Sequence, residues 1–300
     1  MRVSRRVPSG ALSRIVERRG QSEFGQARSD VEPRSDLLPG CEEFFWRWNG
    51  GARLQARLPA ALLARPARSK LGSFDDQVRV LIAPVWANVK ITPSYAGLFT
   101  GQTGMSHIIV DDLTIMRAMP NMVTVAPADD VEAAQALRWA AAYQGPCYVR
   151  LGRDATARLF DETYRFEFGK AVVVREGRDV TLFGTGAQTP RVVEAADLLA
   201  ADGIEAHIVH LPTLKPLDVP AIIAAADRTG RVMTVEEHSI IGGLGGAVAE
   251  TLSEHHPTRV DRIGLRDVFP QSGPNDALLD IYGLSAARVA EQVRSLLRPV

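Results

Sequence analysis

The amino-acid sequence predicts an α/β protein of two domains, each built around a mainly parallel sheet with helices on both faces. From about residue 74 onward, short apolar runs alternate with longer stretches in which apolar residues recur at helical spacing. The short runs are apolar at nearly every position, which is typical of parallel strands buried on both faces. The length of 300 residues is sufficient for two hydrophobic cores.

The first domain is expected to span residues 73–158. Its helix at 129–143 has the clearest signals, because Asp129 is a suitable N-cap and Gly145 with Pro146 ends the pattern. The expected elements, in chain order, are a helix at 75–85, a strand at 88–91, a glycine-rich loop at 95–107, a helix at 111–119, a strand at 122–125, the helix at 129–143 and a strand at 147–151.

A polar, irregular stretch at 153–167 indicates a linker, so residues 159–300 are expected to hold the end of this linker and the second domain. Apolar strands again alternate with helices, which favours a parallel sheet. We expect strands at 180–183, 206–211, 232–235 and 260–265, and helices at 189–201, 219–226, 245–254 and 285–297.

Residues 1–72 differ from the rest and are left unassigned. The first 70 residues hold thirteen Arg and one Lys against seven acidic residues, while the whole chain has no net charge. One interpretation is a disordered segment. Another is a displaced reading frame, since GC-rich DNA read out of frame tends to encode Arg, Ala, Pro and Gly. Nucleic-acid binding is not expected, because the arginines are scattered and no recognition motif accompanies them.

Cysteine use and hydropathy favour a cytoplasmic protein. Cys41 and Cys147 are the only cysteines and lie in dissimilar contexts, so they indicate neither a disulfide framework nor a metal site. No apolar run reaches the length of about 18 residues that a membrane span requires. The N-terminus lacks the apolar core of a secretory signal. We therefore expect no membrane association.

The loop Gly101–His107 follows an expected strand and precedes a helix. Glycines let a backbone turn sharply and approach a ligand closely. A histidine at the end of such a loop can donate a hydrogen bond to a sugar or carbonyl oxygen, or transfer a proton near neutral pH. From spacing alone, a histidine that caps the next helix or meets a neighbouring carbonyl is the favoured alternative.

Two arginines lie at the end of the strand at 147–151. Arginine binds phosphate with its planar fork, and Arg153 lies just past the carboxyl end of this strand, where α/β sheets place ligands. Arg150 lies within the strand itself. From spacing alone, a surface ion pair is the favoured interpretation of both.

Two further motifs carry weaker signals. The turn Gly184–Gly186 could hold an anion, but it is only a fragment of a dinucleotide fingerprint, and we do not expect a nicotinamide site. Glu236, Glu237 and His238 are adjacent on an extended segment, so they point to alternating sides and cannot easily share one metal ion. We interpret them as a satisfied strand end at a subunit contact.

The chain from about Phe74 to Arg298 resembles the transketolase family, and most closely the C-terminal half of bacterial transketolases that are split into two polypeptides. The resemblance implies a truncated pyrimidine-binding domain, a complete transketolase C-terminal domain and a two-carbon ketol transfer between sugar phosphates. It rests on five motifs: Ser106–His107, residues 116–121, Leu151–Arg153, Glu236–Gly246 and residues 267–274.

The resemblance also implies site residues, a cofactor and partners. His107 would lie in the substrate channel and touch the sugar, and Arg153 would bind the substrate phosphate. Thiamine diphosphate with a divalent metal, Mg²⁺ by analogy, would be shared with an N-terminal-half subunit in a self-associating assembly. Where the family often has an acidic pair in the loop, this chain has Gln102 and Thr103. An aspartate that contacts a substrate hydroxyl would therefore be missing.

The catalytic residues of the family are not recognisable in this chain. The sequence contains neither a Gly-Asp-Gly motif nor an Ala-Glu-Gln-Asn motif. The family glutamate would fall near Glu43, and the aromatic residues that stack on the cofactor near Arg65 and Arg68, so we assign no catalytic role to Glu43. The alternatives are an inactive or frameshifted remnant, or a subunit related to deoxyxylulose-phosphate synthase or to the β subunit of 2-oxo-acid dehydrogenases.

Overall fold

The computed structural model describes residues 44–47, 53–56, 62–63 and 77–298. The interpretation of residues 1–72 therefore falls almost entirely outside the described residues, as do Glu43, Arg65 and Arg68. Within that stretch the backbone of β1 (Phe44–Arg47) pairs antiparallel with β2 (Arg53–Ala56), where the sequence indicates no regular strand.

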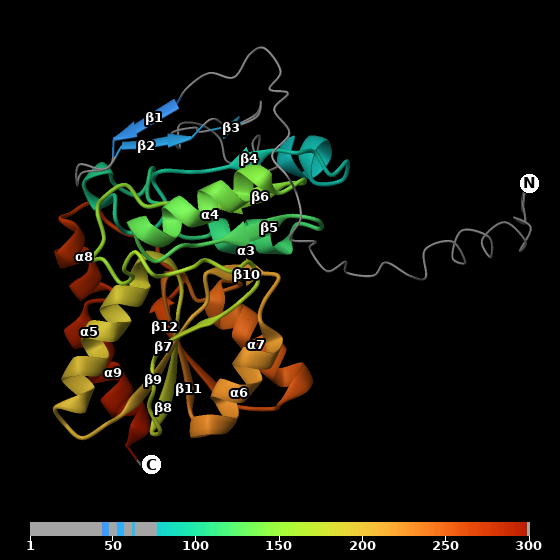
Figure 1. Cartoon of the computed structure of the whole chain (residues 1–300). Coiled ribbons are helices and arrows are strands. Elements are labelled where there is room, and N and C mark those ends of the chain that lie inside the picture. Colours follow the sequence, from blue (N-terminus) through green and yellow to red (C-terminus); the bar gives the residue numbers. More distant parts are fainter. Residues whose placement is uncertain (1–43, 48–52, 57–61, 64–76, 299–300) are drawn as a thin grey trace, which may run out of the picture. The chain divides into compact units, whose positions relative to one another are not determined.

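The first sheet has five strands in the order β10-β5-β6-β4-β3 (Figure 1). Its strands run parallel, except that β10 is antiparallel to β5. The strands are β3 (Leu62–Leu63), β4 (Lys90–Ile91), β5 (Val123–Val125), β6 (Cys147–Val149) and β10 (Thr213–Lys215). Because β10 belongs to the second half of the chain, the two halves share this sheet.

The second sheet has five strands in the order β12-β11-β8-β9-β7. Only the pair β7 and β9 is antiparallel. The strands are β7 (Val172–Arg175), β8 (Val180–Gly184), β9 (Ala206–His210), β11 (Val232–Ser239) and β12 (Val260–Leu265). The expected fold class, α/β with two mainly parallel sheets, is confirmed.

Helices cover both faces of the second sheet. Figure 1 shows α5 (Thr189–Ala200) and α9 (Ala286–Leu297) on one face, and α6 (Val219–Thr229) and α7 (Leu244–His255) on the other. Side chains of β8 alternate accordingly, since Leu182 packs in the core under α5 and α9 while Phe183 packs in the core on the opposite face. The apolar character of these strands follows from this double burial.

The remaining helices are short or belong to the first half of the chain. They are η1 (Val78–Ile82), η2 (Gly101–Thr103), α3 (Asp112–Ala118), α4 (Asp130–Ala142), η3 (Gly186–Gln188) and α8 (Asn275–Ile281). The predicted cap of α4 is present, because the Asp129 carboxylate accepts a hydrogen bond from the Glu132 N–H at 2.9 Å. No described helix combines the length and apolarity that crossing a bilayer requires.

Candidate functional site

The glycine-rich segment begins after β4 and is anchored beside the second sheet. The Gly97 N–H donates to the Ile109 carbonyl at 2.8 Å, and the Leu98 N–H donates to the Glu237 carboxylate at 3.2 Å. Gly97 has φ +73°, and a Cβ at this position would overlap the Glu237 carboxylate. Only glycine therefore fits here without displacing the acid that holds the loop.

His107 lies near the end of this segment, between η2 and α3. Its side chain is half-buried, and its Nδ1 atom lies 2.9 Å from the Ser106 hydroxyl. Within residues 77–298, Nε2 makes no hydrogen bond, and the side chain neither caps α3 nor meets a backbone carbonyl. The second ring nitrogen is therefore free to bond an incoming ligand.

Arg153 follows β6 and has an exposed side chain. Its guanidinium carbon lies 5.5 Å from the centre of the Tyr95 ring. Such a cation–π contact orients the guanidinium and leaves its N–H groups available for an anion.

The segments that carry His107 and Arg153 meet at Ala96. The Ala96 N–H donates to the Leu151 carbonyl at 3.2 Å, and Ala96 also forms a parallel bridge with Ile109. Both segments therefore follow the carboxyl ends of neighbouring strands, β4 and β6, where open α/β sheets bind ligands.

Arg150 is placed quite differently from Arg153, since it is buried and fully paired. Its guanidinium binds the Asp112 carboxylate at 2.9 Å and the Glu237 carboxylate at 2.7 Å. The Tyr148 hydroxyl also donates a hydrogen bond to the Asp112 carboxylate at 2.6 Å. The expectation of a surface ion pair is wrong for Arg150, because its partners come from α3 and β11 inside the fold.

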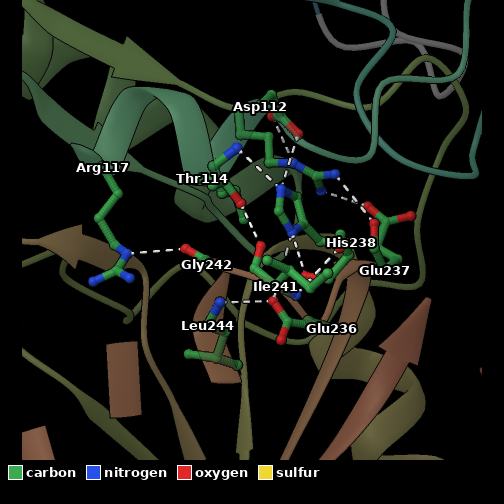
Figure 2. A network of polar contacts seen from close by, with 12 residues as sticks. Asp112, Thr114, Arg117, Glu236, Glu237, His238, Ile241, Gly242 and Leu244 are labelled. Carbon is green, nitrogen blue, oxygen red and sulfur yellow. Dashed lines mark hydrogen bonds and ion pairs between the residues drawn. The ribbon is translucent and has the colours of Figure 1, made fainter. Parts of the chain in front are cut away.

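Glu236, Glu237 and His238 lie at the end of β11 and point to different partners, as their alternation predicts. Glu236 accepts hydrogen bonds from the N–H groups of Leu244 and Gly245 at 2.6 and 2.8 Å, at the start of α7. The Leu113 N–H donates to Nε2 of His238 at 3.2 Å. Figure 2 shows Asp112, Glu237 and His238 converging between α3 and β11.

These three residues are satisfied within their own chain, as expected, and the subunit contact at this strand end stays a prediction. The strand extends to Ser239 rather than ending at residue 235, and its polar side chains find partners in α3, in α7 and in Arg150, which follows β6. Further contacts join α3 to the segment that follows β11. The Thr114 hydroxyl donates to the Ile241 carbonyl at 2.7 Å, and the Arg117 guanidinium donates to the Gly242 carbonyl at 3.1 Å (Figure 2).

Burial dominates the protonation of this cluster. It raises the pKa of Glu236 to about 7, although the Gly245 and Leu244 N–H groups oppose the shift. It also raises the pKa of Glu237 to about 7 against the pull of Arg150. Burial lowers the pKa of His238 to about 4, and Asp112 only partly offsets this. His238 is therefore neutral at pH 7, as its role as a hydrogen-bond acceptor from Leu113 requires.

A second buried polar chain joins α4 to β9. His210 Nε2 lies 2.7 Å from the Glu132 carboxylate, and His210 Nδ1 lies 2.8 Å from the Thr189 hydroxyl. The Tyr164 hydroxyl donates to the other Glu132 oxygen at 2.5 Å. Sequence reasoning missed this network, because its members are far apart in the chain.

The turn Gly184–Gly186 is held by contacts within the fold. The Gly186 N–H donates to the Ala126 carbonyl at 3.1 Å, and the Thr185 hydroxyl donates to the Leu211 carbonyl at 2.7 Å. Beside this turn lies a cavity of about 20 Å³, bordered by Arg150, Gly152 and Glu237 among others. A space of this size holds roughly one water molecule.

The residues at the two departures from the family pattern lie on η2. Gln102 is exposed, whereas the half-buried Thr103 donates from its hydroxyl to the Thr100 carbonyl at 2.6 Å. The loop therefore presents no carboxylate at these positions. Among the residues that the structure describes, no group of three His, Cys, Asp or Glu side chains could hold a metal ion.

Two family models match this chain. The model described as the transketolase pyrimidine binding domain matches residues 70–158, and the model described as the transketolase C-terminal domain matches residues 169–289. The first match contains the segments of His107 and Arg153, and the second contains Glu236–His238.

Known relatives agree with these matches. A Methanocaldococcus jannaschii protein named as a transketolase C-terminal section is 42% identical over 219 residues, which are 72% of this chain and 68% of the relative. The subunit SqwH of a 6-deoxy-6-sulfo-D-fructose transketolase from Clostridium sp. (strain MSTE9) is 38% identical over 71% of this chain and 66% of its own. The chain thus spans about two thirds of the length of these relatives.

A solved structure described as "Split gene transketolase, inactive beta4 tetramer" has the same fold. It superposes with a TM-score of 0.70 at 42% identity and covers 75% of this chain and 72% of that one. This chain belongs to the transketolase family, and it is similar to the C-terminal subunits of its split members.

Proposed function

We propose that this chain is the C-terminal-half subunit of a split transketolase. In this role it transfers a two-carbon ketol unit between sugar phosphates, together with an N-terminal-half subunit. One observation carries the proposal: the segments of His107 and Arg153 meet at Ala96, at the carboxyl ends of β4 and β6. A sugar hydroxyl and a phosphate are the groups that an imidazole and a guanidinium at such an edge recognise.

The cofactor is thiamine diphosphate with Mg²⁺, and the partner subunit binds its diphosphate group and the metal ion. The sequence contains no Gly-Asp-Gly motif, and residues 77–298 offer no cluster of metal ligands. When bound, this cofactor supplies the carbanion that cleaves the ketose. The part of this chain that the structure describes then binds and orients the sugar phosphate through His107 and Arg153.

Reconstitution tests the proposal. The chain is purified alone and mixed with the N-terminal-half subunit encoded beside it or in the same genome, with thiamine diphosphate and Mg²⁺. Ketol transfer from a ketose phosphate to an aldose phosphate is expected only in the mixture. A folded complex that turns over no ketose donor contradicts the proposal.

The same assay separates the alternatives. Decarboxylation of pyruvate with condensation onto an aldose phosphate identifies a deoxyxylulose-phosphate synthase, and acyl transfer from a 2-oxo acid identifies a dehydrogenase β subunit. The absence of an Ala-Glu-Gln-Asn motif favours the inactive remnant. Resequencing the DNA for residues 1–75 and translating every frame tests whether that motif lies in another frame.

A further inference from the structure

The segment Ser272–Pro274 contributes to the family resemblance, but the proposed reaction does not use it. In the structure it lies against the glycine-rich loop. The Gly273 N–H donates to the Gly101 carbonyl at 3.0 Å, and a Cβ on Gly104 would lie 2.7 Å from the Ser272 hydroxyl oxygen. The C-terminal domain therefore supports the loop of His107 directly.

Asn275, the first residue of α8, extends this support to the segment of Arg153. Its side-chain oxygen accepts a hydrogen bond from the Gly101 N–H at 3.0 Å, and its side-chain nitrogen donates to the Asp154 carboxylate at 2.6 Å. Asp154 directly follows Arg153. One amide side chain thus joins the segment that leads to His107 with the segment that carries Arg153.

The stability of α8 does not explain why residue 275 is an asparagine. Its N-cap residue, Pro274, makes no side-chain capping bond, and the buried residues of the helix are Leu278 and Leu279. Asparagine is also a poorer helix former than alanine. Both polar groups of the Asn275 side chain are committed to the other domain.

We propose that Asn275 is a positioning residue that sets the spacing between His107 and Arg153, so that one sugar phosphate contacts both. This inference rests on the proposed function of the site. A ligand that bridges two points binds more tightly when their spacing is fixed in advance, because less freedom is lost on binding.

The hydrogen bonds from Asn275 to Gly101 and Asp154, here called the Asn275 clamp, can be tested by hydrogen exchange of the unliganded chain. This test does not require an active enzyme. Asn275→Ala is expected to accelerate exchange at the Gly101 amide by roughly fivefold or more, since it loses a net hydrogen bond. Exchange across α5 should stay unchanged. Asp276→Ala is the matched control, because this exposed neighbour lies on the same helix turn. Unchanged exchange at Gly101 in Asn275→Ala overturns the proposal.

Kinetics of the reconstituted enzyme test the consequence. Asn275→Ala is expected to raise KM for the sugar phosphate roughly fivefold, with kcat and the thermal midpoint little changed. Asn275→Asp should raise KM as well, because two carboxylates then face each other. Adding Asp154→Asn exchanges the carboxylate and the amide and should restore KM.

The outcomes separate the two proposals. A double variant no better than Asn275→Asp, or a loss of kcat that parallels a loss of thermal stability, overturns the positioning role. If the wild-type mixture turns over no donor, the proposed function fails. The clamp itself is then decided by hydrogen exchange at Gly101 alone.

Discussion

The guanidinium of Arg150 and the carboxylate of Glu237 lie 2.7 Å apart, and both side chains are almost completely buried. Arg150 comes from the end of β6 and Glu237 from β11, so the pair joins the two sheets. Glu237 also accepts the Leu98 N–H from the glycine-rich loop. One buried contact thus holds together both halves of the fold and the segment that leads to His107.

Arg150→Met is expected to destabilise the chain strongly. The variant leaves Asp112 and Glu237 buried without a cation, and breaking a buried pair from one side costs about 3–5 kcal/mol. The free energy of unfolding in urea measures the loss. Arg288→Met is the control, because the ion pairs of Arg288 with Asp280 and Glu291 are exposed, and such pairs contribute about 1 kcal/mol or less. Equal losses in the two variants would contradict the importance of the buried pair.

Gly97→Ala is expected to cost more than a positive φ alone explains. Gly203 has a similar φ of +79° with no atom near a notional Cβ, so Gly203→Ala isolates the backbone effect, about 1–2 kcal/mol. Gly97→Ala also pushes against Glu237, which adds about 1–3 kcal/mol of overpacking. Urea unfolding of both variants gives the difference. Similar costs would show that Glu237 moves aside freely.

Local signals in the sequence predicted much of the fold. The expected strand at 260–265 coincides with β12, and the helix at 129–143 agrees with α4 to within one residue, because a cap, a periodic core face and a Gly-Pro stop all agree. The strand β10 was not predicted, since prolines on both sides of Thr213–Lys215 indicate a loop. Tertiary pairing with β5 overrides that signal.

The site was predictable only in part. Spacing alone favoured a capping histidine and a surface ion pair, and the resemblance to the transketolase family is what indicated His107 and Arg153 as substrate-binding residues. The contacts that hold them could not be predicted. Asn275 and Gly101 are 174 positions apart, and Arg150 and Glu237 are 87 apart, so no local pattern records either contact.

His238 is expected to make stability fall in mild acid. Its pKa is lowered from 6.5 to about 4 in the fold, mainly by burial. Between these values the unfolded chain binds a proton that the folded chain does not, so the contribution is complete above pH 6.5 and is lost as pH falls toward 4. The loss amounts to about 3 kcal/mol.

The measurement compares the free energy of unfolding of wild type and His238→Gln at pH 7.5, 6 and 4.5. The free energy of unfolding of wild type should fall relative to that of His238→Gln as pH decreases from 7.5 to 4.5. The raised pKa values of Glu236 and Glu237 have the opposite sign, since they favour folding as pH falls below 7, and both proteins retain them. His255→Gln is the control, because half of that side chain is exposed. Parallel pH profiles for wild type and His238→Gln would contradict the assignment.

Arg153→Ala is expected to weaken phosphate recognition in the reconstituted enzyme. A charge-assisted hydrogen bond contributes about 1.5–3 kcal/mol, so KM for a sugar phosphate should rise roughly 10- to 100-fold. Arg153→Lys should recover only part of this, because an ammonium group lacks the planar fork. Steady-state kinetics with a phosphorylated and an unphosphorylated acceptor measure the effect.

The unphosphorylated acceptor is the internal control, since its KM should be the same in wild type and Arg153→Ala. Arg158→Ala is the matched variant, because this exposed arginine on the same irregular segment pairs with Asp130 instead of facing the site. A tenfold loss with both acceptors would show that Arg153 orders the segment through Tyr95 rather than binding phosphate. An unchanged KM for the sugar phosphate would remove Arg153 from the substrate site.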